Sequence, residues 1–179
     1  MIAWMSRSRR DKVWHKRNLE RYKAGECDLV LRYGNSPNTD FSKILGGYNE
    51  ITENTDTIIV VEGIMDKVNV DSKLGLLDND LMKCVFTFGN KISIEQMKLI
   101  NKHKNITIIY LLYDYGTIRE SKHNGLMMLD NSNCKDVRVC EIKQEDKDPG
   151  DLSVDELVEV LGNSIGSFEF NCSVVDGIE

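Results

Sequence analysis

Two short apolar runs stand out from a chain that is otherwise mixed in polarity. Residues 57–61 read Thr-Ile-Ile-Val-Val, and residues 106–113 are again almost wholly apolar. Unbroken apolar runs of this length are typical of strands that are buried on both faces, as in parallel sheets covered by helices. The pattern therefore predicts an α/β protein in which both runs are buried strands.

Each of these two predicted strands ends in a carboxylate. Glu62, Gly63 and Asp66 follow the first run, and Asp114 follows the second. Glycine lets the backbone turn sharply into a helix, and open α/β sheets bind ligands at the carboxyl ends of their strands. Carboxylates that gather there need a cation between them, and oxygen ligands favour Mg²⁺ or Mn²⁺. An acidic surface turn without chemistry is the alternative for the first of these junctions.

From residue 57 onward, predicted strands and helices alternate. This alternation is typical of βαβ units with right-handed crossovers, and it predicts a four-stranded, mainly parallel sheet flanked by helices. The expected strands are 57–61, 84–88, 106–113 and 137–142, and the expected helices cover about 65–73, a segment opened by the Ser93–Gln96 capping box, and about 120–131.

An acidic loop follows the fourth expected strand. Residues 145–151 contain four acids, and Pro149 and Gly150 predict a turn. This loop would lie at the same end of the sheet as Glu62 and Asp114, where it would close a metal site. The alternative is a solvated turn before a helix capped at Ser153. Beyond Gly162 we expect a weakly structured tail.

The N-terminal part has a different pattern. Residues 1–25 are expected to be largely helical and to stop at Gly25. Residues 28–33 read as a short strand, and 34–40 as a loop. With the first sheet strand at 57, the domain limits that we expect are a basic arm and lead-in at 1–56, the sheet domain at 57–162 and a tail at 163–179.

Charge is distributed unevenly along the chain. The net charge of the 179 residues is −6, but residues 1–25 hold eight Lys/Arg against two acids, so that this arm carries +6 and the remainder −12. Trp4, Trp14 and Tyr22 lie among the cations. Cations bind phosphates and aromatic rings stack on bases, so the arm is a candidate for binding nucleic acid. A solvated helix with its aromatic rings packed on a core is the alternative.

Composition narrows the class of protein. A hydrophobic content of 41% and a charged content of 29% are typical of globular proteins, and no apolar run approaches the ~20 residues that cross a bilayer. The apolar start is too short for a secretory signal. The five cysteines form no C-x-x-C pair, which argues against zinc and against a disulfide framework. We therefore expect a cytoplasmic protein without a membrane partner.

The order of these motifs resembles the TOPRIM domain of DnaG-type bacterial and phage DNA primases. The resemblance covers about residues 30–160. It is carried by residues 60–66 (Val-Val-Glu-Gly-Ile-Met-Asp), by Asp114, and by 146–149 (Asp-Lys-Asp-Pro), with 88–90 and 93–96 similar to the family's second strand-to-helix junction. Residues 32–39 and 45–48 resemble the segment that precedes TOPRIM in those primases.

The resemblance implies roles for individual residues. Glu62 would act as a general acid/base or metal ligand, Asp66 as a supporting acid and Asp114 as the first carboxylate of a D-x-D motif. The implied Mg²⁺ or Mn²⁺ ligands are Glu62, Asp114, Asp146 and Asp148. The implied template or nucleotide contacts are Arg32, Tyr33, Asn35 and Ser36, to which the basic arm adds Arg9, Arg10, Lys16 and Arg17.

The chain departs from the family pattern in several places. Residues 114–116 read Asp-Tyr-Gly, so the second carboxylate of D-x-D is missing, and Thr117 begins a segment that replaces the usual small-residue turn. We also expect neither a zinc module nor a helicase region. The sequence thus predicts a shortened or split primase core of the kind that a phage or mobile element carries.

Three functions remain open at this point. The first is a primase-like nucleotidyltransferase of DNA replication that makes RNA primers from NTPs on single-stranded DNA, with a replicative helicase or another replisome protein as a further partner. The second is a TOPRIM metal-dependent nuclease. The third is a catalytically degenerate module that binds nucleic acid or a replisome protein.

Overall fold

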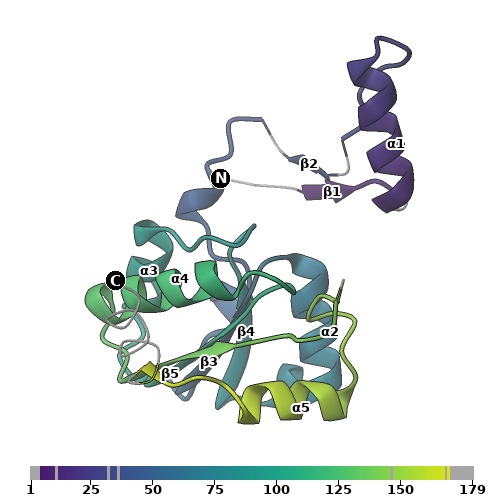
Figure 1. Ribbon diagram of the computed structural model, residues 1–179. Helices are drawn as coiled ribbons and strands as arrows, with labels where there is room; N and C mark the ends of the chain where they lie inside the picture. Colours follow the sequence, from purple (N-terminus) through teal and green to yellow (C-terminus); the bar gives the residue numbers. More distant parts are fainter. Residues whose placement is uncertain are drawn as a thin grey trace, which may run out of the picture. The chain divides into compact units, whose positions relative to one another are not determined.

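Four parallel strands form the centre of residues 41–179 (Figure 1). They are β3 (Thr57–Val61), β4 (Met82–Phe86), β5 (Ile108–Leu112) and β6 (Asp136–Cys140), paired in the order β4-β3-β5-β6. Because β3 and β5 are parallel neighbours, the residues that follow them emerge at the same edge of the sheet. The predicted α/β fold with a parallel four-stranded sheet is confirmed.

The computed structural model describes residues 5–10, 12–31, 33–35, 37–145, 147–167 and 169. These divide into two compact units, Met1–Asp40 and Phe41–Glu179. Within the described ranges, no helix combines the length and the apolar character that a bilayer span requires.

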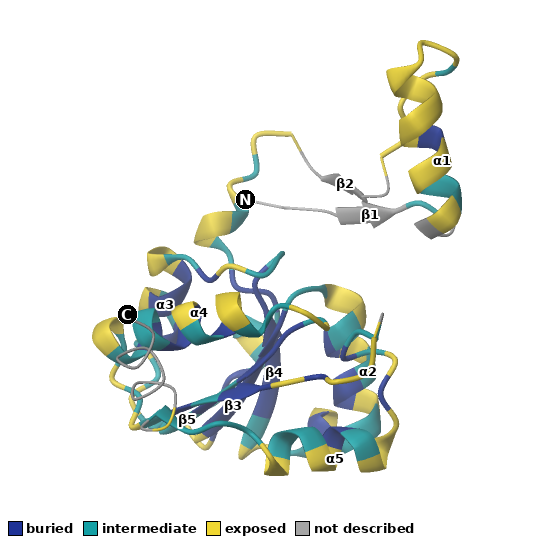
Figure 2. Cartoon of the chain, in the orientation of Figure 1, coloured by how far each residue is buried: buried dark blue, intermediate teal, exposed yellow. Residues whose placement is uncertain are grey.

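Helices cover both faces of the sheet. Ile58 and Val60 of β3 share one apolar cluster with residues of α3 (Ile94–Ile100) and α4 (Ile118–Asn131). Ile59 and Val61 share the other cluster with residues of α2 (Ile64–Leu74) and α5 (Val154–Gly162). These four strand residues are fully buried, and Figure 2 shows the sheet as the dark centre between the two helical layers. Burial on both faces explains why the sequence of β3 is apolar without interruption.

Residues 41–46, the first residues of the second unit, pack on the sheet of that unit. Gly46 pairs with Phe86 at the outer edge of β4, where each backbone N–H donates to the other residue's carbonyl at 2.9 and 3.0 Å. A Cβ on Gly46 would lie 2.1 Å from the Phe86 ring, so only glycine allows this approach. The buried Gln96 side chain also donates to the carbonyls of Phe41 and Ile44. The compact division therefore falls after residue 40, while the domain limits expected at 56 and 162 stay predictions.

Short 3₁₀ helices complete the sheet unit. They are η1 (Phe41–Lys43), η2 (Tyr48–Glu50) and η3 (Leu76–Asp78). The capping boxes predicted at the starts of α3 and α5 are confirmed, because the hydroxyls of Ser93 and Ser153 accept the N–H groups of Gln96 and Glu156. After α5, Ile165 forms a single antiparallel bridge with Val139.

The N-terminal unit differs from the sequence prediction. β1 (Met5–Arg7) pairs antiparallel with β2 (Tyr33–Asn35), and α1 spans Lys12–Lys23. The expected helix over 1–25 is therefore wrong at residues 5–7. Its predicted end is confirmed, because Gly25 has φ +76° and its N–H donates to the Tyr22 carbonyl at 2.9 Å.

The strand expected over residues 28–33 is also misplaced. Asn18 of α1 is buried, and its amide donates to the Asp28 carbonyl at 3.1 Å and accepts from the Val30 N–H at 2.9 Å. A side chain thus satisfies the backbone that a neighbouring strand would otherwise pair. Leu31 stays 64% exposed, so the apolar residues of this segment are not buried as a strand in a sheet would be.

Candidate functional site

Glu62 and Asp114 lie together at the carboxyl edge of the sheet. Glu62 directly follows β3, and Asp114 follows β5 by two residues. The backbone N–H of Asp114 donates to Oε1 of Glu62 at 3.3 Å. The parallel pairing of β3 with β5 is what brings the two acids to one point.

Asp66 belongs to the first turn of α2 and shapes the junction after Glu62. Its Oδ2 accepts the backbone N–H of Gly63 at 3.0 Å. A carboxylate at this position satisfies one of the free N–H groups at a helix start and interacts favourably with the helix dipole. Asp66 therefore has a folding role besides the supporting acidic role expected from the sequence.

The acidic loop reaches the same site. A Cβ built on Gly150 would lie 2.9 Å from Nδ2 of Asn69, 3.1 Å from Oδ1 of Asp148 and 3.5 Å from Oδ1 of Asp66. Two carboxylates from distant segments thus approach one point of the Gly150 backbone. The loop also contacts the β5 junction, because the Tyr115 N–H donates to the Lys147 carbonyl at 3.1 Å. Asp146, the other expected ligand in this loop, lies outside the described residues.

The charges of these acids act on one another. Burial and the neighbouring charge of Asp114, followed by Asp66 and Asp148, raise the pKa of Glu62 to about 7, against an opposing hydrogen bond from the Asp114 backbone. Desolvation and like charges both disfavour the ionised carboxylate. Near neutral pH, Glu62 therefore exchanges its proton readily, and a cation at the site would favour the ionised form.

The donor atoms suit Mg²⁺ or Mn²⁺ in an open site. The carboxylates of the site supply oxygen, the ligand atom that these ions prefer. They are those of Glu62, Asp66, Asp114 and Asp148. Among the described residues, however, no group of three or more Asp, Glu, His or Cys side chains is arranged to hold a metal ion. This arrangement fits an ion bound by one or two carboxylates and completed by water and substrate phosphates, which is the usual mode of Mg²⁺.

The β5–α4 junction is open where the second aspartate was expected. Gly116 has φ +80°, and a Cβ there would meet no atom within 4 Å. The Thr117 hydroxyl donates to the Asp114 carbonyl at 2.7 Å and closes the turn. A hollow of about 310 Å³ is lined by residues 114–118 and 140–143, between the ends of β5 and β6.

The expected nucleic-acid residues belong to the N-terminal unit. Arg9, Arg10, Lys16 and Arg17 are exposed. The Arg10 guanidinium lies 5.3 Å from the centre of the Trp14 ring, in a cation–π contact. Arg32 and Ser36 lie outside the described residues, and Tyr33 and Asn35 are described only through their backbone pairing in β2.

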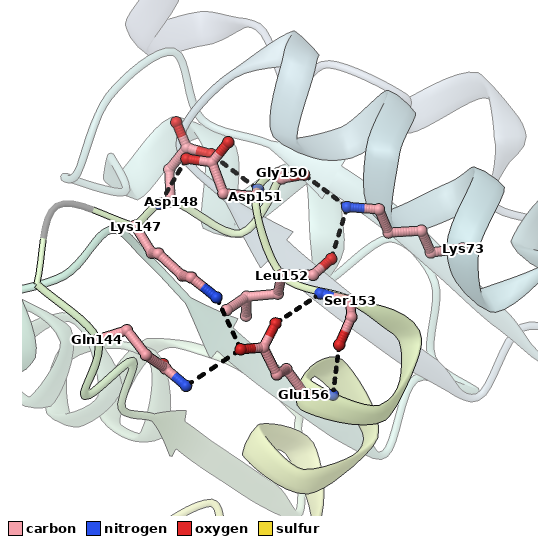
Figure 3. A network of polar contacts seen from close by, with 9 residues as sticks. All are labelled: Lys73, Gln144, Lys147, Asp148, Gly150, Asp151, Leu152, Ser153 and Glu156. Carbon is pink, nitrogen blue, oxygen red and sulfur yellow. Dashed lines mark hydrogen bonds and ion pairs between the residues drawn. The ribbon is translucent and has the colours of Figure 1, made fainter.

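Two residues of the site region were not singled out from the sequence. Asn69 contacts the Gly150 backbone, and Lys73 donates to the carbonyls of Gly150 and Leu152 (Figure 3). The nearest sequence signal is the position of Lys73 in the last turn of α2, where a cation is common in any helix. That signal gives no partner, because the loop lies more than 75 residues further along the chain.

Comparison with known proteins identifies the fold. No protein-family model and no curated protein sequence matches the chain. Among solved structures, the zinc-binding and RNA polymerase domains of the Aquifex aeolicus primase match 80% of this chain and 36% of their own, with 22% identity and a TM-score of 0.61. A DnaG primase catalytic domain bound to single-stranded DNA matches 82% of this chain and 47% of its own, with 18% identity and a TM-score of 0.61.

A further match is an assembly of the bacteriophage T7 lagging-strand DNA polymerase with primase domains bound to an RNA/DNA hybrid. It covers 74% of this chain and 65% of the matched chain, with 17% identity and a TM-score of 0.55. The chain thus spans less than half the length of the first two structures that it matches. At these identities the likeness concerns the fold, and the chain has the fold of primase catalytic domains.

Proposed function

We propose that this chain is a primase-like nucleotidyltransferase that makes short RNA primers from NTPs on single-stranded DNA. The observation that carries the proposal is the approach of acids from three junctions at one sheet edge. There Glu62 accepts the Asp114 N–H, and the charge of Asp148 contributes to raising the pKa of Glu62. The fold shared with DnaG-type catalytic domains supports the same class of reaction.

The divalent ion belongs to this proposal. Glu62, Asp114 and Asp148 are its proposed ligands, and Asp146 remains a proposed ligand outside the described residues. When bound, Mg²⁺ or Mn²⁺ would activate a 3′-hydroxyl and neutralise the triphosphate as pyrophosphate leaves.

The chain's own groups have distinct proposed tasks. Without a metal ion, the pKa of Glu62 is raised to about 7. A bound cation would favour the ionised carboxylate, which would act as a metal ligand or accept a proton. Asp114 and Asp148 add the negative charge that favours a cation. The hollow beside Asp114, whose lining includes Thr117 and Lys143, would receive part of the nucleotide.

The basic arm is the proposed nucleic-acid contact. If Arg9, Arg10, Lys16 and Arg17 bind phosphates, affinity for single-stranded DNA should fall with salt by roughly 0.7 log units per log unit of salt for each contact. Deleting residues 1–25 should flatten this slope in a fluorescence anisotropy titration. An unchanged slope would mean that the arm does not bind the strand. Arg32, Tyr33, Asn35 and Ser36 remain proposed contacts for template or nucleotide.

A non-catalytic binding module is the second candidate. Gly116 in place of a carboxylate, together with the lack of a three-residue metal group among the described side chains, favours it. In this case the chain would hold nucleic acid or a replisome protein. The T7 assembly, in which primase domains contact a DNA polymerase, supports a replisome partner for either candidate.

A primer-synthesis assay tests the proposal. The chain is incubated with single-stranded DNA, labelled NTPs and either Mg²⁺ or Mn²⁺, alongside Glu62→Gln and the exposed control Glu53→Gln. We expect short RNA products from the wild type and from Glu53→Gln, with more product in Mn²⁺. Strand cleavage without NTPs would instead identify a nuclease. DNA binding without either activity would identify the binding module.

A further inference from the structure

Lys73 connects helix α2 to the acidic loop. Its Nζ donates to the Gly150 carbonyl at 2.6 Å and to the Leu152 carbonyl at 2.5 Å (Figure 3). Lys73 is half-buried and sits in the last turn of the same helix whose first turn carries Asp66. Helix α2 therefore carries Asp66, one acid of the site, and also Lys73, the cation that holds the loop in which Asp148 lies.

A second anchor holds the other end of this loop. Lys147 donates to Oε1 of Glu156 at 2.7 Å, and Oε2 of Glu156 accepts the Ser153 N–H at 2.8 Å. The hydrogen bond from Lys147, followed by that from the Ser153 backbone, lowers the pKa of Glu156 to about 2. This anchor ties the loop to α5, whereas Lys73 ties it to α2.

Asp148 lies between the two anchors. Its Oδ1 accepts the Asp151 N–H at 3.1 Å, and Oδ2 of Asp151 accepts the Asp148 N–H at 3.4 Å (Figure 3). These reciprocal bonds fix the Asp148 side chain relative to its own loop. They do not fix the loop relative to Glu62 and Asp66, which belong to the β3–α2 junction.

Contacts between Gly150 and α2 supply that missing link. The Gly150 backbone packs so closely against Asn69 that a Cβ would lie 2.9 Å from its Nδ2. The packing of Gly150 against Asn69 determines how closely the loop approaches α2. The two charge-assisted hydrogen bonds from Lys73 determine the position of the loop along α2. An ammonium has three donors, enough to bind both carbonyls at once.

We propose that Lys73 is a positioning residue that holds Asp148 beside Glu62 and Asp66 by fixing the carbonyls of Gly150 and Leu152 to α2. This inference rests on the proposed metal site. The α5 anchor keeps the loop folded without Lys73, so removing the lysine should displace Asp148 more than it destabilises the domain.

Mn²⁺ titration calorimetry on the full chain tests the role. Lys73→Met is compared with the wild type, with Lys73→Arg, and with Lys98→Met, which removes an exposed lysine whose only described partner is Glu95. We expect Lys73→Met to weaken Mn²⁺ binding roughly tenfold, in the range found for outer partners of metal ligands. Lys73→Arg should recover part of the loss, since its guanidinium also donates to two carbonyls, and Lys98→Met should bind like the wild type. Equal affinity in Lys73→Met and the wild type would overturn the proposal.

Amide hydrogen exchange of the metal-free protein separates this inference from the proposed function. The Asp151 N–H reports the Asp148 bond, and the Tyr115 N–H reports the contact of the loop with the β5 junction. If even the wild type binds no Mn²⁺, the proposed metal site fails, and faster Tyr115 exchange in Lys73→Met than in Lys98→Met still supports the positioning role. Unchanged Tyr115 exchange in a folded Lys73→Met protein would contradict it.

Discussion

The two strand-to-helix junctions at the carboxyl edge of the sheet are built differently. After β3 the chain turns into α2 through Glu62 and an extended Gly63 with φ −131°, and Asp66 accepts the Gly63 N–H. After β5 the chain passes through a left-handed Gly116 and enters α4 at Thr117, whose hydroxyl bonds backwards to Asp114. The first junction places two acids close to the backbone, and the second leaves open space.

This difference assigns different tasks to the two junctions. Charge is concentrated at the first, where burial and neighbouring acids raise the pKa of Glu62. The second provides one carboxylate, Asp114, next to a hollow of about 310 Å³. Two acids at the first junction and one acid beside open space at the second suit an ion whose coordination is completed by a substrate.

The largest expected effect comes from neutralising the first junction. Glu62→Gln keeps the size of the side chain but removes its charge and its ability to accept a proton. Since a general base contributes about 10²–10⁴-fold, primer synthesis should fall at least a hundredfold. Product yield on single-stranded DNA measures this, with Glu53→Gln as the control. Retained activity in Glu62→Gln would remove Glu62 from the site.

Filling the gap between the acidic loop and the first junction should have the next largest effect. In Gly150→Ala the new methyl would displace Asn69 and Asp148, so we expect about tenfold weaker Mn²⁺ binding. Gly162→Ala is the matched control, because a Cβ there meets no atom within 4 Å. Calorimetry measures both variants. If Gly150→Ala binds as tightly as Gly162→Ala, the loop does not need its close approach to α2.

A pH series tests the electrostatics of the first junction without metal. The pKa of Glu62 rises from its ordinary 4.5 to about 7 on folding, so only the unfolded chain ionises between these values. Glu62 therefore lowers folding stability as pH rises from about 4.5 to 7, and Glu62→Gln removes this loss. The variant should exceed the wild type in unfolding free energy by about 2 kcal/mol at pH 8, less than the full linkage value because the group is partly exposed.

Urea denaturation at pH 4 and pH 8, with EDTA present, gives the comparison. The advantage of Glu62→Gln should nearly vanish at pH 4, where both states of the wild type are protonated. An advantage that is independent of pH would mean that burial and neighbouring acids do not act on this carboxyl.

The smallest expected effect comes from adding an acid to the second junction. Gly116→Asp would supply the carboxylate that the resemblance to primases implies two residues after Asp114, in open space, and should strengthen Mg²⁺ binding. Because φ is +80°, any side chain costs about 1 kcal/mol of stability. Gly116→Asn, which carries the same strain without the charge, is the control for both measurements. Equal Mg²⁺ affinity in the two variants would mean that position 116 does not correspond to the family's second aspartate.

Sequence pattern predicted the sheet unit because its strands are buried on both faces. Ile58–Val61 has no polar position, and such a run is compatible with few other environments. The proximity of Glu62 and Asp114 could also be predicted, since parallel strands bring the residues that follow them to one edge of the sheet. The N-terminal unit gave no comparable signal. Leu29, Val30 and Leu31 resemble a strand in sequence, yet they remain exposed, and Asn18 binds the backbone of Asp28 and Val30 instead.

Contacts that depend on tertiary structure were beyond the sequence. Lys73 binds carbonyl oxygens, which every residue has, so nothing in the sequence indicates its partners. The left-handed conformation of Gly116 is one that glycine adopts readily, but it is set by the turn after β5. Gly150 likewise reads as a turn residue, whereas its close contact with α2 emerges only from the packing.

Binding of one divalent ion between the junctions is the central claim, and paramagnetic broadening by Mn²⁺ tests it most directly. Backbone amide resonances of the labelled chain are followed during addition of substoichiometric Mn²⁺. The claim predicts early loss of the signals of Gly63, Asp114 and Asp148, which lie in three different junctions, and no such loss in Glu62→Gln. Selective broadening elsewhere, for example at the exposed acids Asp155 and Glu159 of α5, would contradict the claim. The claim would also be contradicted if the signals of Gly63, Asp114 and Asp148 were lost equally in the wild type and in Glu62→Gln.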